Sequence, residues 1–162
     1  MQKNKGQKGF SLIELLIVVA IIGIIAAIAI PNLLASRKAA NEASAISSLR
    51  TVSSAEATYS STVGNGSYGA MTSLSSNGLI DGKLAAAIDV ANAKSGYLFA
   101  INPSAATGGY AAGFTAGAAP STANGGTRKF AGDESGVIVA NPTTGSTGTA
   151  PTSTAGGTPI GN

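Results

Sequence analysis

A single carboxylate, Glu14, lies inside a run of apolar residues near the start of the chain. Residues 10–30 number 21, and Glu14 is the only charged residue among them. As an α-helix this run would measure roughly 30 Å, which matches the hydrocarbon core of a bilayer. A carboxylate costs about 2.5–3.5 kcal/mol at the bilayer centre and less near an edge. We therefore expect an interaction at Glu14 that offsets this cost.

The residues around Glu14 resemble the processing site of type IV prepilins. The resemblance rests on Gly9-Phe10-Ser11-Leu12-Ile13-Glu14-Leu15. Its first residue, Gly9, is the last residue of a basic leader over residues 1–9. In that family a dedicated peptidase cuts after the glycine and N-methylates the new terminal phenylalanine. The resemblance implies cleavage between Gly9 and Phe10, methylation of Phe10, and pairing of Glu14 with the N-terminal amine of a neighbouring subunit, which would offset its cost.

Two other interpretations of the apolar run stay open. One is an ordinary secretory signal peptide, since Ala27-Ile28-Ala29 offers a small-x-small cleavage site. The other is a plain membrane anchor, since any apolar segment of about 20 residues can span a bilayer. The run is longer than the usual apolar region of a signal peptide, and Glu14 interrupts it. Neither alternative explains why Glu14 falls five residues after Gly9.

The charges of the chain are unevenly placed. Ten Lys and Arg residues stand against seven Asp and Glu, but Lys3, Lys5 and Lys8 lie in the leader, so the rest of the chain has seven of each sign. We do not interpret this balance as a nucleic-acid signal, and no nucleic-acid partner is evident. Positive charges beside a first span hold that end in the cytoplasm, so the head is expected on the periplasmic side of the inner membrane.

Cysteine and histidine are both absent from the chain. Without cysteine the disulfides that stabilise small exported domains cannot form, and the chain departs from the many pilins that close a C-terminal loop with a disulfide. Histidine is the commonest acid-base residue and transition-metal ligand. We therefore predict no enzymatic activity, no cofactor and no metal site.

A kink or loosened turn is predicted within the long N-terminal helix. Pro31 lacks an N–H and its ring clashes with the preceding turn, while Gly23 weakens the same stretch. The alternative is that Pro31 ends the membrane helix. If the helix continues through it, the resemblance implies a segment that can lose helical order in a fibre and make the filament extensible.

An amphipathic helix is predicted over residues 31–63, after the apolar helix of residues 10–30. We expect it to end near Gly64-Asn65-Gly66 and to turn its apolar stripe toward a following domain. The stripe consists of Leu34, Ala45, Leu49, Val52, Tyr59 and Val63.

The predicted fold is α+β, with this helix packed on a small antiparallel sheet in a head over residues 64–140. Residues 68–84 are expected to be loop with one helical turn, and residues 116–127 a linker. Strands are predicted at residues 96–102, 110–115, 128–131 and 136–140. The side chains expected to face the helix are those of Tyr97, Phe99, Phe114, Phe130 and Val139.

The last 22 residues, 141–162, contain seven Thr, five Gly, three Pro and no charge. Such a composition predicts a disordered or extended, flexible and solvent-exposed tail, and its Ser and Thr residues permit O-glycosylation. Asn65-Gly66-Ser67 fits the N-glycosylation triplet but also forms turns by itself. Residues 133–136 are interpreted as a hairpin turn, with a calcium site as the alternative.

The resemblance implies a structural subunit, the major pilin of a type IV pilus. Its partners would be other copies of the chain, the prepilin peptidase, and an assembly platform with ATPase motors and a secretin. The precursor would lie in the inner membrane and the mature subunit in an extracellular filament. The alternatives are a pseudopilin of a type II secretion system, or a minor pilin that acts as an adhesin or DNA-binding module. Only Arg128-Lys129 offers a basic pair for DNA.

Overall fold

The structure is a computed structural model that describes residues 9–105 and 112–161. It separates into two compact units, Met1–Ser36 and Arg37–Asn162, and each is described by itself. Residues 1–8 of the predicted leader lie outside the described residues, as does Tyr110 at the start of one predicted strand.

Helix α1 (Leu12–Thr62) is continuous through both weak points that the sequence contains. Leu and Ala favour helix in its first half, and Gly23 and Pro31 both lie within it. The Asn32 side-chain amide donates to the Ile28 carbonyl at 3.1 Å, next to the proline. The alternative that Pro31 ends the helix is wrong, whereas the predicted kink stays a prediction.

The end of α1 confirms the predicted breaker cluster. The helix stops at Thr62, and Asn65 and Gly66 follow with φ of 47° and 87°. The Gly66 amide donates to the Ser60 carbonyl at 2.9 Å, which satisfies one of the carbonyls left free at a helix end.

The second half of α1 buries the predicted stripe only in part. Ala45, Leu49 and Val52 are buried and Tyr59 packs against the core, but Leu34 and Val63 are about half exposed. Two carboxylates, Glu42 and Glu56, occupy further buried positions on this helix. Hydrophobic periodicity does not detect them, because an acidic residue counts as polar wherever it points.

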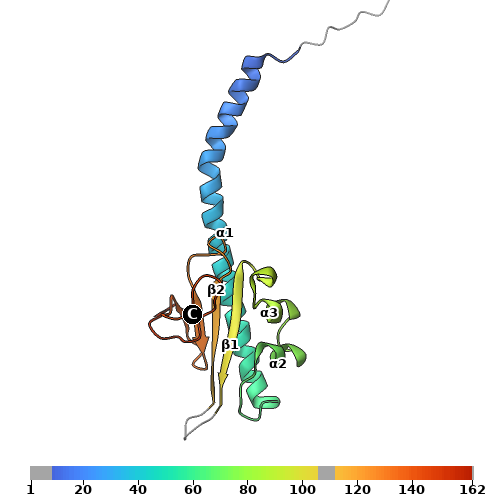
Figure 1. Cartoon of the computed structure of the whole chain (residues 1–162), viewed down its shortest axis with the longest axis vertical. Coiled ribbons are helices and arrows are strands. Elements are labelled where there is room, and N and C mark those ends of the chain that lie inside the picture. Colours follow the sequence, from blue (N-terminus) through green and yellow to red (C-terminus); the bar gives the residue numbers. More distant parts are fainter. Residues whose placement is uncertain (1–8, 106–111, 162) are drawn as a thin grey trace, which may run out of the picture. The chain divides into compact units, whose positions relative to one another are not determined.

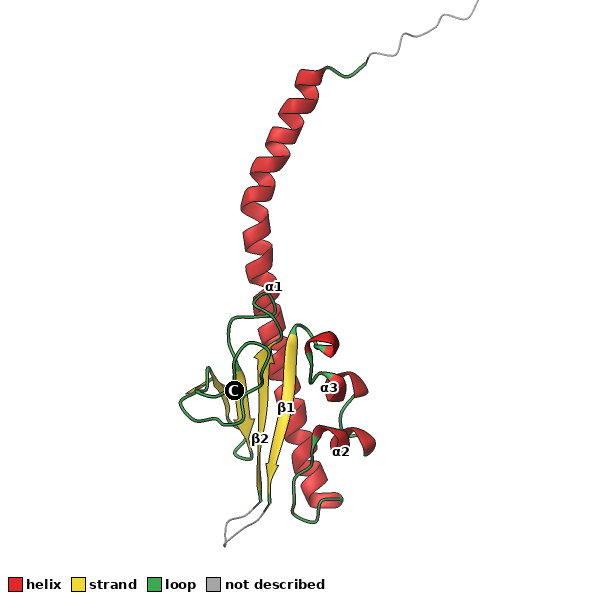
Figure 2. Cartoon of the chain, in the orientation of Figure 1, coloured by secondary structure: helices red, strands yellow, loops and turns green. Residues whose placement is uncertain are grey.

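Three short helices follow α1, and two of them begin within residues 68–84, where the sequence predicted a loop with one helical turn. They are α2 (Met71–Ser76), α3 (Gly82–Ala86) and the 3-10 helix η1 (Val90–Asn92). Asp81 caps α3 by accepting a hydrogen bond from the Leu84 amide at 2.7 Å. Figure 2 shows these helices in the part of the head that precedes the strands.

The head contains a five-stranded antiparallel sheet in which sequence neighbours pair, in the order β1-β2-β3-β4-β5. The α+β prediction is confirmed, and Figure 1 shows the long strands β1 and β2 lying along α1. The strands are β1 (Tyr97–Ser104), β2 (Gly113–Pro120), β3 (Phe130–Asp133), β4 (Ile138–Ala140) and β5 (Thr158–Pro159).

Strand β2 corrects the prediction of a linker over residues 116–127. The strand continues to Pro120, which pairs with Tyr97 at the start of β1. Its small residues serve close packing, because a Cβ at Gly117 would collide with the carbonyl oxygen of Pro151. Alanine and glycine have low strand propensity, but that propensity is overridden where the strand is buried by neighbours on both faces.

The two faces of the sheet pack against different parts of the chain. Phe99, Phe130 and Ile138 belong to the core shared with α1, whereas Leu98 and Val139 are buried outside that core. Successive residues of a strand point to opposite faces, so Val139 cannot share a face with its neighbour Ile138. The prediction that Val139 faces the helix is therefore wrong, and Ile138 takes that place.

The C-terminal segment, residues 141–161, forms part of the head. It is mostly irregular, as expected, but Pro142 and Pro151 are fully buried. The Lys129 ammonium donates to the carbonyls of Thr144 and Gly145 at 3.0 and 2.8 Å. The expectation that the segment is solvent-exposed throughout is wrong, because it supplies cover for the second face of the sheet; its flexibility stays a prediction.

The turn between β3 and β4 confirms the predicted hairpin. The Gly136 amide donates to the Asp133 carbonyl at 3.0 Å, and Gly136 has a φ of 77°. The Asp133 carboxylate accepts from the amide and the hydroxyl of Ser135. Both bonds go to Oδ1 and hold the carboxylate within the turn, whereas Oδ2 accepts from the Thr154 hydroxyl at 3.2 Å.

Candidate functional site

The first half of α1 exposes nearly all of its apolar surface. Every Leu, Ile and Val side chain between residues 12 and 34 is 46–80 % exposed. Within the described part of the chain, α1 is the one helix that is long and apolar enough to cross a membrane. Isolated exposed apolar residues are normal, but a contiguous surface of this size marks contact with lipid or with another protein.

Glu14 has a structural partner at the start of this helix. Its Oε2 atom accepts a hydrogen bond from the Ser11 amide at 2.8 Å, three residues before it. This contact is half of a capping box, in which a glutamate in the first turn satisfies an amide that the helix leaves free. The spacing Ser11-x-x-Glu14 is the sequence signal for this cap, and the sequence predictions did not use it.

Gly9 and Phe10 lie directly before the cap, and both are exposed. A Cβ built at Gly9 would meet no atom within 4 Å, so nothing in the described chain covers the predicted cleavage bond. The structure thus brings Gly9, Phe10 and Glu14 together at the beginning of α1. Gly23 and Pro31 lie further along the helix and take no part in this cluster.

A second polar cluster forms in the head around Glu42, which sequence reasoning missed. Its Oε1 atom accepts from the Thr127 amide, the Thr127 hydroxyl and the Arg128 amide at 2.9, 2.7 and 3.2 Å. Its Oε2 atom accepts from Arg128 Nε at 2.8 Å. Burial alone raises the pKa of Glu42, but the hydrogen bonds from Thr127 and Arg128 outweigh burial and lower it.

Neighbouring hydrogen bonds also attach residues 125–128 to α1 and to β1. The Asn41 side-chain amide donates to the Gly125 carbonyl at 2.8 Å, and the Tyr97 hydroxyl donates to the Arg128 carbonyl at 2.7 Å. Burial raises the pKa of Tyr97, and the nearby charge of Glu42 raises it further. These hydrogen bonds hold residues 125–128 in place on α1 and β1.

The basic pair Arg128-Lys129 is engaged within the chain. Arg128 contacts Glu42 and lies 5.4 Å from the centre of the Phe130 ring, and Lys129 donates to two backbone carbonyls. About half of the Arg128 side chain is exposed. Recognition of the DNA phosphate backbone needs a stripe of free cations. These two residues do not form one.

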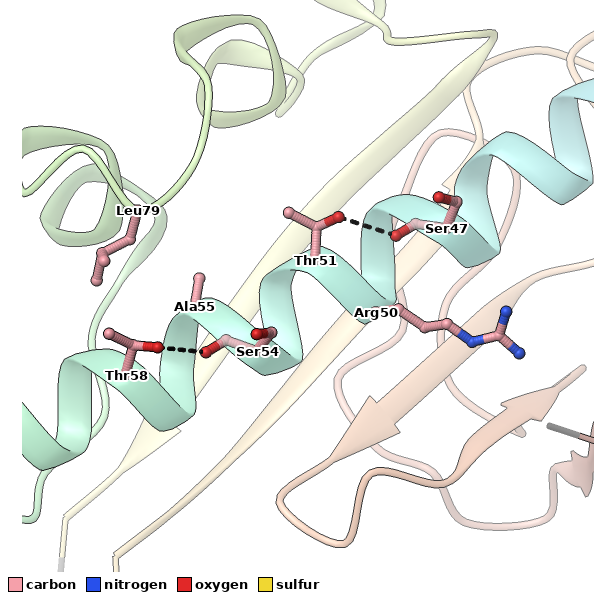
Figure 3. Close-up of a pocket in the computed structure, with 7 residues that line it drawn as sticks. All are labelled: Ser47, Arg50, Thr51, Ser54, Ala55, Thr58 and Leu79. Atoms are coloured by element: carbon pink, nitrogen blue, oxygen red, sulfur yellow. Dashed lines mark hydrogen bonds between the residues drawn. The ribbon is translucent and has the colours of Figure 1, made fainter.

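A shallow hollow of about 440 Å³ runs along the outer side of α1. The hydroxyls of Thr51 and Thr58 donate to the carbonyls of Ser47 and Ser54 at 3.1 and 3.0 Å, as Figure 3 shows. The donor of each of these hydroxyl groups is therefore satisfied within the helix. The lining is formed by Ser47, Arg50, Thr51, Ser54, Ala55, Thr58 and Leu79.

The chemistry of this hollow suits packing. Arg50 is its one ionisable residue, so the hollow has no acid-base pair for catalysis. In residues 9–105 and 112–161, no group of three or more acidic, histidine or cysteine side chains is placed to hold a metal ion.

Comparison with known proteins finds similarity at the N-terminus. Residues 4–30 match the family described as the prokaryotic N-terminal methylation motif. The chain is 68 % identical over 38 residues to the type IV wide pilus major component PilA4 of Thermus thermophilus, and 45 % identical over 56 residues to the type IV major pilin protein PilA of Myxococcus xanthus. It is also 39 % identical over 49 residues to the type II secretion system core protein G of Vibrio cholerae.

These similarities cover 24 %, 35 % and 30 % of the chain, and the matched segments span 29 %, 26 % and 34 % of the three relatives. No solved structure matches the chain significantly. The range matched by the family, residues 4–30, contains Gly9, Phe10 and Glu14 and does not reach the sheet or the C-terminal segment.

Proposed function

Because this chain is a member of the type IV pilin and pseudopilin superfamily, we propose that it is the major pilin of a type IV pilus. In this proposal a prepilin peptidase cleaves the chain between Gly9 and Phe10 and methylates Phe10. The mature subunits then polymerise through α1 into a helical surface filament. The apolar helix and the similarity to type IV pilins fit a membrane-anchored precursor and an extracellular filament.

The observation that carries the proposal is the exposed apolar half of α1 with its single carboxylate. Between residues 12 and 34 no large apolar side chain is buried within the chain, so another medium must cover them. Lipid can do so before assembly and other copies of the helix afterwards. Since lipid solvates Leu and Ile about as well as a helix does, assembly must be driven by close packing and by the partner of Glu14.

The geometry of Glu14 is compatible with two simultaneous tasks. One oxygen accepts from the Ser11 amide, and the other has no hydrogen-bond partner among the described residues. Cleavage after Gly9 would create a cationic amine at Phe10 of each subunit. The second oxygen would pair with that amine in a neighbouring copy and neutralise the carboxylate in an apolar surrounding.

The outer hollow of α1 supports packing against further copies. Apart from Arg50 and Leu79 its lining side chains are short, and the hydroxyls of Thr51 and Thr58 already donate to the helix backbone. A second helix can therefore approach closely without stranding these polar groups. When one surface of each copy contacts a different surface of the next, the copies form an open helical filament if the rotation between neighbours does not close into a ring.

The remaining partners follow from the superfamily. The precursor would lie in the inner membrane, and the assembly platform, ATPase motors and secretin would build and export the filament. Gly23 and Pro31 would let the helix loosen locally as the filament forms, because Pro31 removes one backbone hydrogen bond.

The test is the N-terminal residue and mass of protein sheared from the cell surface. We expect abundant sheared material that begins at N-methylated Phe10. A Gly9→Leu variant, as control, should stay uncleaved in the membrane fraction. A terminus at Ile30 would mean an ordinary secreted protein and would refute the proposal.

A pseudopilin of a type II secretion system is the second candidate, favoured by the similarity to core protein G. Its assembly would be short and periplasmic, so the sheared fraction would contain little of it and deletion would impair protein secretion. A minor pilin acting as an adhesin or DNA-binding module would be present in shear fractions only at low abundance relative to another subunit.

A further inference from the structure

Glu56 is a carboxylate that the proposed assembly does not use. It lies on the second half of α1 and is 0 % exposed. Its Oε2 atom accepts from the Gly69 amide at 2.9 Å. Its Oε1 atom has no hydrogen-bond partner in the described part of the chain. A fully buried oxygen without a partner requires an explanation.

The Gly69 contact ties Glu56 to the loop of residues 64–70, which joins α1 to α2. Gly69 lies close to the Tyr59 ring, since a Cβ there would come within 3.1 Å of it. The Tyr68 ring packs against Phe114 at the start of β2, with ring centroids 4.9 Å apart and ring planes tilted by 53°. The loop is therefore seated on both α1 and the sheet, with Glu56 beneath it.

Tyr59 on α1 lies against Gly69, and Tyr68 belongs to the loop. Glu134 accepts from the Phe114 amide through Oε2 at 3.3 Å, and Phe114 contacts the Tyr68 ring. On the second half of α1, Glu42 is bonded to Thr127 and Arg128, and Arg50 lines the hollow. No Lys or Arg forms an ion pair with Glu56 among the described residues. Burial raises the pKa of Glu56, and the hydrogen bond from Gly69 opposes this effect only in part.

Comparison with Glu42 shows what Glu56 lacks. Both carboxylates are buried on the same helix, but Glu42 receives four hydrogen bonds, one of them from a guanidinium. Glu56 receives one, from an amide. The charged form is thus stabilised at Glu42, whereas at Glu56 the neutral acid fits the site better than an ion.

We propose that Glu56 is a proton-controlled latch for the 64–70 loop: the protonated acid lets the loop sit on α1, and loss of the proton to solvent releases the loop. A neutral carboxyl can stay in this dry site with one hydrogen bond. An ionised one needs water or further donors, and the loop is the cover that must move to admit them. Because the loop leads directly into α2, opening would also free the start of that helix.

The pH dependence has a defined sign. Below the pKa of the unfolded chain, Glu56 is protonated in both states and its contribution to stability is complete. As pH rises from that value toward the raised folded pKa, the folding equilibrium constant falls by up to tenfold per pH unit, because one proton is lost on unfolding. Above the folded pKa this dependence ends and the loop is released.

The test uses the full mature chain in detergent micelles and does not depend on polymerisation. The carboxyl carbons of Glu are labelled with 13C, and the Glu56 resonance is followed by NMR through a pH titration. In parallel, the exchange rate of the Gly69 amide is measured and corrected for the intrinsic effect of pH. Glu56→Gln, which keeps the shape and the acceptor, is compared with Glu134→Gln as the matched control.

We expect the Glu56 carboxyl to titrate well above its ordinary range, and Gly69 protection to fall at least tenfold across that titration. Glu56→Gln should abolish this fall, and Glu134→Gln should retain it. An ordinary titration of Glu56, or the same pH dependence of Gly69 exchange in Glu56→Gln, would overturn the proposal. The NMR titration of the unmodified chain decides the question even if Glu56→Gln does not fold.

Discussion

Removal of the Glu42 carboxylate should destabilise the head, because this group accepts hydrogen bonds from Thr127 and Arg128. In Glu42→Ala the amides of Thr127 and Arg128 and the Arg128 guanidinium lose their acceptor. A buried donor left unpaired costs about 1–3 kcal/mol. The Arg128 side chain is about half exposed, so water replaces its partner and the ion pair itself contributes only about 0–1 kcal/mol. Two partly buried amides therefore predict a loss of about 3 kcal/mol in the free energy of unfolding.

The assay is thermal unfolding of the mature chain in micelles, followed by circular dichroism. A loss of this size should lower Tm by roughly 10 °C in a domain of this length. Ser44→Ala is the matched control, because Ser44 lies on the same helix and loses only an exposed hydrogen bond to Ser95. We expect the control to stay within about 0.5 kcal/mol of the unmodified chain.

The effect should also depend on pH with a fixed sign. The pKa of Glu42 is lowered from its ordinary value of 4.5, so its contribution is complete above that value and is lost as pH falls through the folded pKa. The difference between Glu42→Ala and the unmodified chain should therefore shrink in acid. A difference below about 0.5 kcal/mol at neutral pH, or one that does not change in acid, would refute the account of this cluster.

Three further changes test the remaining features. Glu14→Gln keeps an acceptor for the Ser11 amide but removes the charge, so the helix should still form and the precursor should still insert. The yield of filaments in sheared fractions should collapse. A normal yield would exclude a role for the charge. Gly117→Ala should lower the free energy of unfolding by about 1–3 kcal/mol, because its Cβ would collide with the C-terminal segment. The control Gly132→Ala should lower it less, because its Cβ would make an ordinary contact. Equal losses in thermal unfolding would contradict the close approach at Gly117. Lys129→Met should speed proteolysis within residues 141–161, and an unchanged cleavage rate would show that the ammonium does not hold the segment.

Much of the fold was predictable because its signals are local. The apolar run, the breakers at Gly64-Asn65-Gly66 and the hairpin turn at residues 133–136 each depend on a few adjacent residues, and the structure confirms the helix end and the turn. Prepilin-like cleavage after Gly9 and methylation of Phe10 are predictions from the same kind of local pattern, and the structure adds only that both residues are exposed.

The errors occurred where distant parts of the chain decide the outcome. Residues 116–120 have the composition of a linker, yet they form the end of β2 because β1 and the C-terminal segment bury them. Val139 was assigned to the wrong face, because a shift of one residue in a short strand exchanges its faces. The C-terminal segment lacks apolar residues to form a core, but its prolines bury against a sheet that the rest of the chain has already built.

The sequence by itself determined the character of the first half of α1. The length of the apolar run, the solitary Glu14 and its position five residues after Gly9 depend on neighbours in the chain, and they carry the resemblance to type IV prepilins without any knowledge of the head. Only the tertiary structure decided the roles of Glu42 and Glu56. Both are acids on one helix, but one meets Arg128 and two amides while the other meets a single amide in a closed core. The charge that a buried acid carries is set by the donors around it, and those donors lie 13 and 85 or more residues away in the sequence.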